Sequence, residues 1–206
     1  MRQLLAGFTI LVMLSGALNA APPTAAREPV ERLSETLLET MKAADRLDLA
    51  ERRDRLAPVL REVFDFRFMT RIATGGHWRR LSERHRARLV DRFAGMSIAT
   101  YAARFDGYAG HRFEIGEASD GPGASVRVPT QLVKADGERV AIDYLVRRAS
   151  DESTWQIVDV YLNGRYSELA TRRSEYTSVL KNEGYEALID RLNARIDRMT
   201  AEDQSG

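Results

Sequence analysis

In the first half of the chain, apolar residues recur at spacings of three and four, which is the period of an amphipathic helix. This pattern predicts four helices, over residues 30–41, 49–63, 66–72 and 83–106. Gly75 and Gly76 end the third helix, and Ser82 supplies an N-cap for the fourth. Pro58 lies inside the second helix, where it predicts a kink or an early break.

At Gly110 the period of the apolar residues changes to two, which is typical of β-strands. The alternation predicts four strands, over residues 111–118, 125–134, 140–147 and 155–162. Asp136-Gly137 is a hairpin signal, and Pro129 marks its own strand as an edge strand or a bulge. The last strand is apolar on both faces except at Asp159, which indicates a central strand covered on both sides.

Two more helices, over residues 166–182 and 185–199, close the chain after the strands. The order of helices, an antiparallel meander and helices predicts an α+β fold. We expect a curved four-stranded antiparallel sheet packed against a mostly helical layer.

The first twenty residues have the features of a secretory signal peptide. Arg2 precedes an apolar run, and small residues allow cleavage after Ala17 or after Ala20. The alternative is an uncleaved membrane anchor, although the run is shorter than the ~20 apolar residues of a spanning helix. We therefore expect export to the periplasm. The predicted organisation is a signal peptide at 1–20, a linker at 21–29, one domain at 30–200 and a disordered tail at 201–206.

Composition narrows the class of protein further. The 206 residues contain 31 basic and 30 acidic side chains, and this balance argues against a nucleic-acid-binding protein. The chain has no cysteine, which excludes disulfides, thiolate chemistry and the acylated cysteine of a bacterial lipoprotein. An exported domain of this kind depends on its own hydrophobic core for stability.

Motifs for catalysis are absent from the sequence. It contains neither a phosphate-binding loop nor a G-x-S-x-G nucleophile elbow. The three histidines, at 77, 85 and 111, are not spaced as metal ligands, so we expect no metal site. Asp143 and Asp159 are the best candidates for acid–base chemistry, but ordinary strand charges are the simpler interpretation. We assign no catalytic residue.

One run of residues carries a specific resemblance. FDFRFMTR at 64–71, followed by GGHW at 75–78, Phe93, Thr100-Tyr101 and Tyr108, resembles the MlaC/Ttg2D family. The similarity extends over roughly residues 30–200. It implies a periplasmic lipid-binding component of an ABC-linked phospholipid transport system, with an NTF2/cystatin-like sheet. It also implies partners in an inner-membrane transporter complex and at the outer membrane, a lipid as cargo, and no cofactor.

A departure from the family pattern follows Val160. SELATRRSE at residues 167–175 looks like the HpnM branch, which is associated with hopanoids. The cargo is therefore either a two-chain phospholipid or a hopanoid, a rigid pentacyclic lipid.

The resemblance also implies an apolar cavity between the two layers. The candidate lining residues are Phe66, Met69, Phe93, Met96, Tyr101, Phe105, Val126, Val128, Ile142, Tyr144 and Val158. Taken one at a time, each of them is equally compatible with an ordinary core. Exposing two acyl chains of ~16 carbons to water costs on the order of 25 kcal/mol, which explains why lipids need such a carrier.

Arginines gather after Trp78, where Arg79, Arg80, Arg84 and Arg88 stand against the single acid Glu83. We expect them to dock transiently on acidic partners, or else to form a solvated helix face. Two other functions compete with the carrier: a small cavity enzyme of isomerase or hydrolase type, and an envelope adaptor that binds no ligand.

Overall fold

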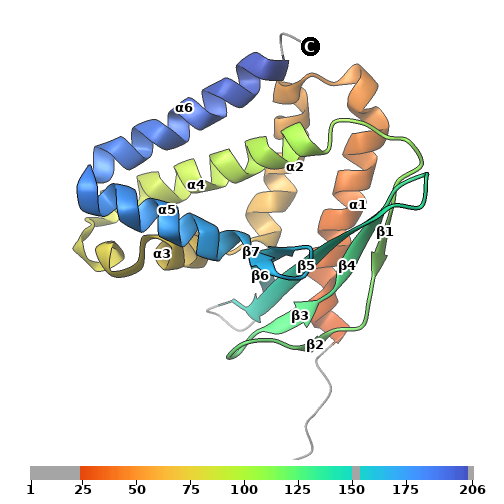
Figure 1. Ribbon diagram of the computed structural model, residues 1–206, viewed down its shortest axis with the longest axis horizontal. Helices are drawn as coiled ribbons and strands as arrows, with labels where there is room; N and C mark the ends of the chain where they lie inside the picture. Colours follow the sequence, from red (N-terminus) through yellow and green to blue (C-terminus); the bar gives the residue numbers. More distant parts are fainter. Residues whose placement is uncertain (1–23, 150–153, 204–206) are drawn as a thin grey trace, which may run out of the picture.

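Two layers, an antiparallel sheet and a set of helices, form the structure, which is a computed structural model (Figure 1). It describes residues 24–149 and 154–203. The helical elements are η1 Thr24–Arg27, α1 Glu28–Ala43, η2 Ala44–Arg46, α2 Leu49–Val63, α3 Phe66–Thr74, η3 Gly75–Arg80, α4 Glu83–Arg104, α5 Glu168–Asn182 and α6 Tyr185–Asp203. The strands are β1 Arg112–Ile115, β2 Ser119–Asp120, β3 Val126–Val128, β4 Thr130–Val133, β5 Arg139–Arg148, β6 Trp155–Leu162 and β7 Tyr166–Ser167.

The sheet is built around β5, the longest strand. On one edge, β4 pairs with the first part of β5 and β3 with the second part, while β6 pairs along the other edge. β1 continues from β4, β2 continues from β3, and the two-residue β7 pairs with β6. The predicted antiparallel meander is therefore present. The strand predicted at 111–118 is shortened to β1, and the strand predicted at 125–134 is divided into β3 and β4. β2 and β7 are additions that the sequence did not predict.

Pro129 is the cause of the division between β3 and β4. Proline has no N–H to donate to a ladder, so regular pairing stops at this residue. Its carbonyl still accepts a 2.8 Å hydrogen bond from the Gly116 N–H. A Cβ at Gly116 would lie 3.0 Å from Pro129 Cγ, so a side chain at this position would be tightly packed against the proline ring. The prediction of an edge strand or a bulge at Pro129 is wrong: β3 and β4 have neighbours on both edges and share one register against β5, and Pro129 is only a break between them.

The placement of β6 differs from the prediction. Ile157, Val158, Asp159 and Val160 are consecutively buried, as expected for a covered strand. However, β5 rather than β6 is the strand with neighbours on both edges along its length. The free edge of β6 is covered by the α2–α3 junction, where the Asp65 N–H donates to the Ile157 carbonyl at 3.0 Å.

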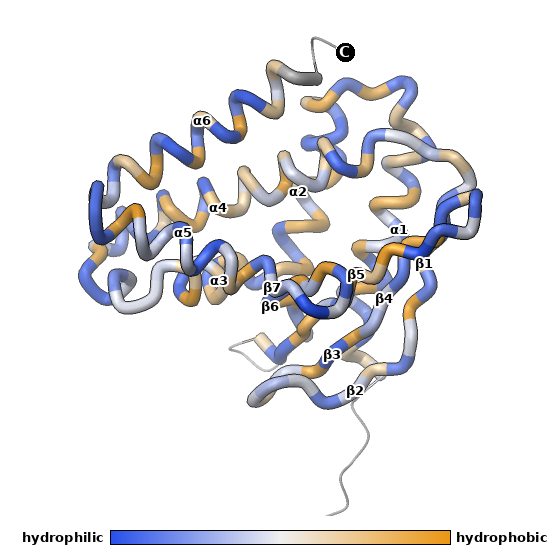
Figure 2. The backbone as a smooth tube through the Cα atoms, in the orientation of Figure 1, coloured by the Kyte–Doolittle hydropathy of each residue, from blue (hydrophilic) through white to orange (hydrophobic). Residues whose placement is uncertain are grey.

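Local signals define the helix ends well. Asp48 and Glu51 form a capping box at the start of α2, and the Ser82 hydroxyl accepts from the His85 N–H at the start of α4. The predicted break at Pro58 does not occur, because α2 continues to Val63. Figure 2 shows hydrophobic and hydrophilic residues alternating along α1 and α6, as an amphipathic helix requires.

The predicted boundaries need two corrections. Thr24–Arg27 forms a 3₁₀ helix and Ala26 is fully buried, so this part of the expected linker belongs to the folded domain. Its small apolar residues pack against β3 and β6, which is why they fold. The end of α6 includes residues 201–203 of the expected tail. The predicted signal peptide lies outside the described residues.

A buried arginine connects α2 to the end of α4. Arg52 is 5% exposed; its Nε donates to the Ala102 carbonyl at 3.1 Å and its Nη1 to the Leu47 carbonyl at 2.7 Å. We expect Arg52→Met to lower the free energy of unfolding by about 2–3 kcal/mol, because both buried carbonyls lose a charged donor. Urea denaturation measures this loss. Arg53→Met, at the less buried neighbouring position, is the control and should cost less than about 0.5 kcal/mol; equal losses in the two variants would contradict the prediction.

Candidate functional site

An apolar cavity of about 410 Å³ lies between the sheet and the helices. Its helical wall comes from α3, α4 and the start of α5, and its other wall comes from β4, β5 and β6. The lining residues are Phe64, Phe66, Met69, Phe93, Met96, Ser97, Thr100, Tyr101, Arg104, Phe105, Leu132, Val140, Ile142, Tyr144, Val160, Leu162, Asn163, Glu168, Leu169 and Arg172. The volume lies within the range of about 300–1,000 Å³ that is typical of ligand pockets.

Eight of the eleven residues predicted to line a cavity do line this one. They are Phe66, Met69, Phe93, Met96, Tyr101, Phe105, Ile142 and Tyr144. The helical wall is therefore the wall that the sequence predicted. The three remaining predicted residues, Val126, Val128 and Val158, are buried but are absent from the cavity lining.

Val126 and Val128 are excluded because other residues cover them. They pair with Val146 and Tyr144 and share their face of the sheet, as alternation predicts. However, η1 packs against β3 on this part of the sheet. The covering residues belong to the segment that the sequence predicted to be a linker, so both errors have one cause.

Val158 is excluded by a β-bulge. Asp159 pairs with Leu145 and Ile157 pairs with Val146, which leaves Val158 as the extra residue in β6. A bulge shifts the alternation of the strand by one residue. As a result Val160 and Leu162 line the cavity, and Val158 does not.

Aromatic rings make up much of the helical wall. Phe64 stacks on Phe66 at a centroid distance of 5.4 Å, and Tyr101 stacks on Phe105 at 5.7 Å. Phe93 meets Phe66 edge-on at 6.1 Å. Rings held by one another have few rotamers available, so this wall can keep its shape around an empty space.

The two tyrosines of the cavity are uncharged. Burial raises the pKa of Tyr101 well above its ordinary value, and the neighbouring Tyr144 adds to the effect. Burial likewise raises the pKa of Tyr144. Because a phenol with a raised pKa keeps its proton at neutral pH, these side chains present no charge to a ligand.

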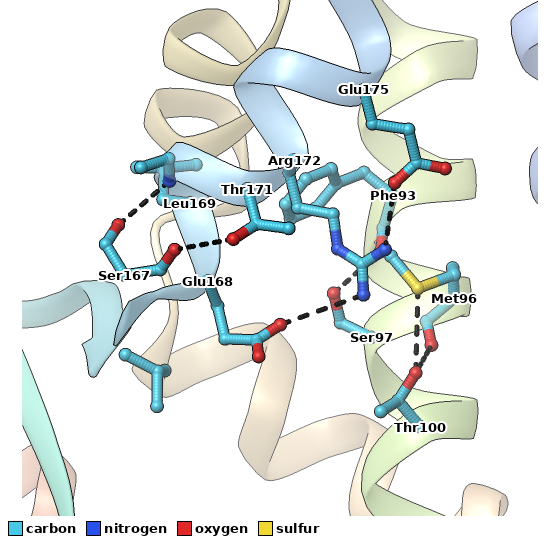
Figure 3. A network of polar contacts seen from close by, with 12 residues as sticks. Phe93, Met96, Ser97, Thr100, Ser167, Glu168, Leu169, Thr171, Arg172 and Glu175 are labelled. Carbon is cyan, nitrogen blue, oxygen red and sulfur yellow. Dashed lines mark hydrogen bonds and ion pairs between the residues drawn. The ribbon is translucent and has the colours of Figure 1, made fainter. Parts of the chain in front are cut away.

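Polar groups gather at one end of the cavity, where α5 faces α4. Figure 3 shows Arg172 reaching from α5 toward Ser97 and Met96 of α4. Arg172 is 9% exposed; its guanidinium lies 3.4 Å from a Glu175 oxygen and 3.9 Å from a Glu168 oxygen. Glu168, Arg172 and Glu175 are close together in the sequence, but no motif links them to Ser97 and Met96 of α4, which are about seventy residues away.

The two candidate acid–base residues lie outside the cavity lining. Asp143 pairs with Arg127 at 3.0 Å on the opposite face of β5 from Tyr144. Asp159 is buried and accepts hydrogen bonds from the Ser167 hydroxyl at 2.6 Å and from the Leu169 N–H at 3.0 Å. Burial raises the pKa of Asp159, and these hydrogen bonds offset part of the rise. The geometry gives Asp159 the role of anchoring the start of α5.

The predicted docking arginines all lie on the surface, but they differ in their partners. Arg88 pairs with Glu186 of α6 at 3.0 Å. Arg79, Arg80 and Arg84 are exposed and form no ion pair within the part of the chain that the structure describes. The intervening Arg86 instead pairs with Glu83 and donates to the Trp78 carbonyl.

The described residues offer neither a metal site nor a membrane-spanning helix. Residues 24–149 and 154–203 contain no group of three His, Cys, Asp or Glu side chains placed to hold a metal ion. Across the same residues, every helix is too short or too polar to span a bilayer.

The open antiparallel sheet, the helical cover and the apolar space between them define a class of α+β proteins with an interlayer cavity. The chain belongs to the MlaC protein family, whose pattern matches residues 31–194. A solved structure with the same fold is the phospholipid-binding protein from Ralstonia solanacearum in complex with a phospholipid. It is 21% identical, with a TM-score of 0.73 over 85% of this chain and 99% of that chain. No curated protein matches the chain.

Proposed function

We propose that this protein is a periplasmic carrier of phospholipid, exported by its N-terminal signal peptide. The observation that carries the proposal is the apolar cavity, in a chain that belongs to the MlaC family. The structurally similar Ralstonia solanacearum protein was solved with a phospholipid bound, which supports the same ligand here.

The cavity is suited to holding acyl chains. Its helical wall of Phe, Met and uncharged Tyr side chains faces aliphatic residues of β4, β5 and β6. Each CH₂ group transferred from water into such surroundings gains about 0.8 kcal/mol. A carrier must bind a lipid about as well as a membrane does, and an apolar cavity with an open end meets that requirement.

The competing functions have less support. The two residues considered for acid–base chemistry, Asp143 and Asp159, are engaged elsewhere, and Glu168, the carboxylate of the cavity lining, lies 3.9 Å from the Arg172 guanidinium. An adaptor without a ligand has no use for an unfilled space of this size. A hopanoid remains the second candidate cargo, on the resemblance of residues 167–175 to the HpnM branch.

The test is to extract the native protein with organic solvent and identify the released lipid by mass spectrometry. The protein should be purified from the periplasm without detergent, so that its cargo is retained. We expect glycerophospholipid. A pentacyclic lipid would establish the hopanoid alternative, and a lipid-free protein that takes up none from vesicles would overturn the proposal.

Lipid delivery should also depend on the exposed arginines. Arg80→Glu with Arg84→Glu should slow the delivery of labelled lipid to native envelope membranes at low salt, because surface charge mainly sets the rate of encounter. Raising the salt concentration should remove the difference between variant and wild type, since salt screens exposed charges. The lipid content of the purified variant should be unchanged. Equal rates for both proteins across the salt series would show that this face is only solvated.

A further inference from the structure

A second hollow, of about 340 Å³, adjoins the apolar cavity. It lies between α4 and α6, and Thr100 and Arg104 line both spaces. The two helices run in the same direction: Arg88 pairs with Glu186 near the start of α6, and Thr100 lies 3.9 Å from the Met199 sulfur near its end. The last turns of the two helices therefore lie side by side (Figure 1).

Three arginines surround this hollow. Arg104 comes from the last turn of α4, and Arg195 and Arg198 come from α6. None of the three forms an ion pair or a hydrogen bond within the described part of the chain. Elsewhere on the same helices, Arg88 and Arg191 are paired with Glu186 and Glu183.

The positive charge extends from the hollow into the cavity. Arg104 lines the apolar cavity together with Tyr101, and it also lines the hollow. Burial raises the pKa of Tyr101 and of Tyr176; the charge of Arg104 offsets part of the rise at Tyr101, and the charges of Arg172 and Arg195 offset part of it at Tyr176. Arg172, which also lines the cavity, lies beside Glu168 and Glu175, whereas Arg104, Arg195 and Arg198 form no ion pair with any carboxylate of the described residues. Unpaired positive charge therefore borders the apolar cavity at Arg104.

Guanidinium groups are well suited to binding phosphate. Their planar N–H groups donate in pairs to phosphate oxygens, and such charge-assisted bonds are about twice as strong as neutral ones. Three like charges around one hollow repel each other unless an anion lies between them. A phospholipid carries its phosphate next to its acyl chains. In this structure the arginine hollow likewise lies next to the apolar cavity.

We infer that Arg104, Arg195 and Arg198 bind the phosphate of an anionic phospholipid whose acyl chains occupy the cavity. This inference rests on the proposed function and adds a headgroup preference to it. Phospholipids with net negative charge are preferred over zwitterionic ones, whose positive group offsets the phosphate. A hopanoid carries no phosphate and gains nothing from this site.

The experiment measures uptake of lipid by the delipidated full-length protein from phosphatidylglycerol or phosphatidylcholine vesicles. The variant is Arg104→Gln with Arg195→Gln and Arg198→Gln. The control is Arg46→Gln with Arg53→Gln and Arg92→Gln, which removes the same charge at positions outside both hollows. Thermal unfolding verifies that each variant is folded, and the single variant Arg104→Gln replaces the triple variant if that one does not fold.

We expect wild type and control to take up phosphatidylglycerol preferentially. The arginine variant should lose this preference by about tenfold or more, since hydrogen bonds to charged groups contribute about 1.5–3 kcal/mol each. Its uptake of phosphatidylcholine should fall by a clearly smaller factor, because the choline cation already offsets the charge of the phosphate that the arginines contact.

Several outcomes would overturn the inference. The inference fails if the arginine variant loses both lipids equally, keeps the preference, or shows the same loss as the control. Each result would show that these arginines do not discriminate between headgroups. If inorganic phosphate stabilises wild type but not the arginine variant while lipid uptake is identical in both, the hollow binds free phosphate instead. A wild type that takes up neither lipid would refute the proposed function itself. A wild type that takes up both lipids equally would refute only the headgroup preference.

Discussion

Replacing Ile142 with Trp is expected to remove most of the bound lipid while leaving the protein folded. Ile142 lies on β5, is 7% exposed, and lines the cavity opposite α4. The larger indole ring has an open space to enter, so it displaces acyl chain rather than neighbouring side chains. The amount of phospholipid extracted per mole of purified protein measures the effect, and thermal unfolding verifies the fold.

Val126→Trp is the matched control. Val126 is also 7% exposed and faces the same side of the sheet, but η1 packs against its strand and it lines no cavity. Here the indole has no space to enter, and overpacking should cost about 1–3 kcal/mol of stability. The protein that stays folded should carry its normal lipid. If Ile142→Trp retains its lipid, or if the two variants lose it equally, the cavity is not the lipid site.

The helical half of the fold was predictable because its signals are local. The bounds predicted for α2 agree with the structure, since its capping box and its apolar spacing both lie within the helix. The cavity residues on α3 and α4 were found for a related reason: a helix period places Phe66 with Met69, and Phe93 with Met96, on the same side. The helix period does not show that these residues face an empty space. That prediction came from the family resemblance.

The strand half of the cavity was less predictable because it depends on contacts between distant segments. Alternation placed Ile142 and Tyr144 correctly, but it cannot show that η1 packs on β3 or that Val158 is a bulge. In an unbroken strand Val158 would share a face with Val160 and Leu162, but the bulge separates it from them. Val160 and Leu162 were not predicted, although plain alternation from Val158 would have included both. Glu168 and Arg172 are neighbours on α5, but Arg104 comes from the end of α4, and no sequence motif shows that it lines the same cavity.

Asp159 is a buried carboxyl beside a cavity wall, so its role bears on whether the protein is a carrier or an enzyme. Its oxygens accept from the Val160 N–H at 2.7 Å, from the Leu169 N–H at 3.0 Å and from the Ser167 hydroxyl at 2.6 Å. Val160 and Leu169 themselves line the cavity, so Asp159 holds a strand residue and a helix residue of that wall in place. All of these contacts are structural.

Asp159→Leu is therefore expected to destabilise the protein by about 3 kcal/mol or more, because three buried donors lose their acceptor. Asp159→Asn should be far milder. The amide oxygen still accepts from both backbone N–H groups, and its NH₂ can donate to the Ser167 hydroxyl oxygen. Urea denaturation at neutral pH gives both values. The Asn variant should also keep its normal lipid content, whereas a catalytic carboxylate would lose its function with this substitution.

The pH dependence provides an independent test of the same residue. Burial raises the pKa of Asp159, so the folded protein binds this proton more tightly than the unfolded chain does. The stability gained from that proton is fully present below the ordinary carboxyl pKa and is lost as the pH rises through the raised value. Wild type should therefore become more stable relative to Asp159→Asn as the pH falls from neutral into the acid range. Urea denaturation of both proteins across that range measures the difference in their free energies of unfolding. A difference that does not change with pH would show that the carboxyl of Asp159 is ionised as readily in the folded protein as in the unfolded chain.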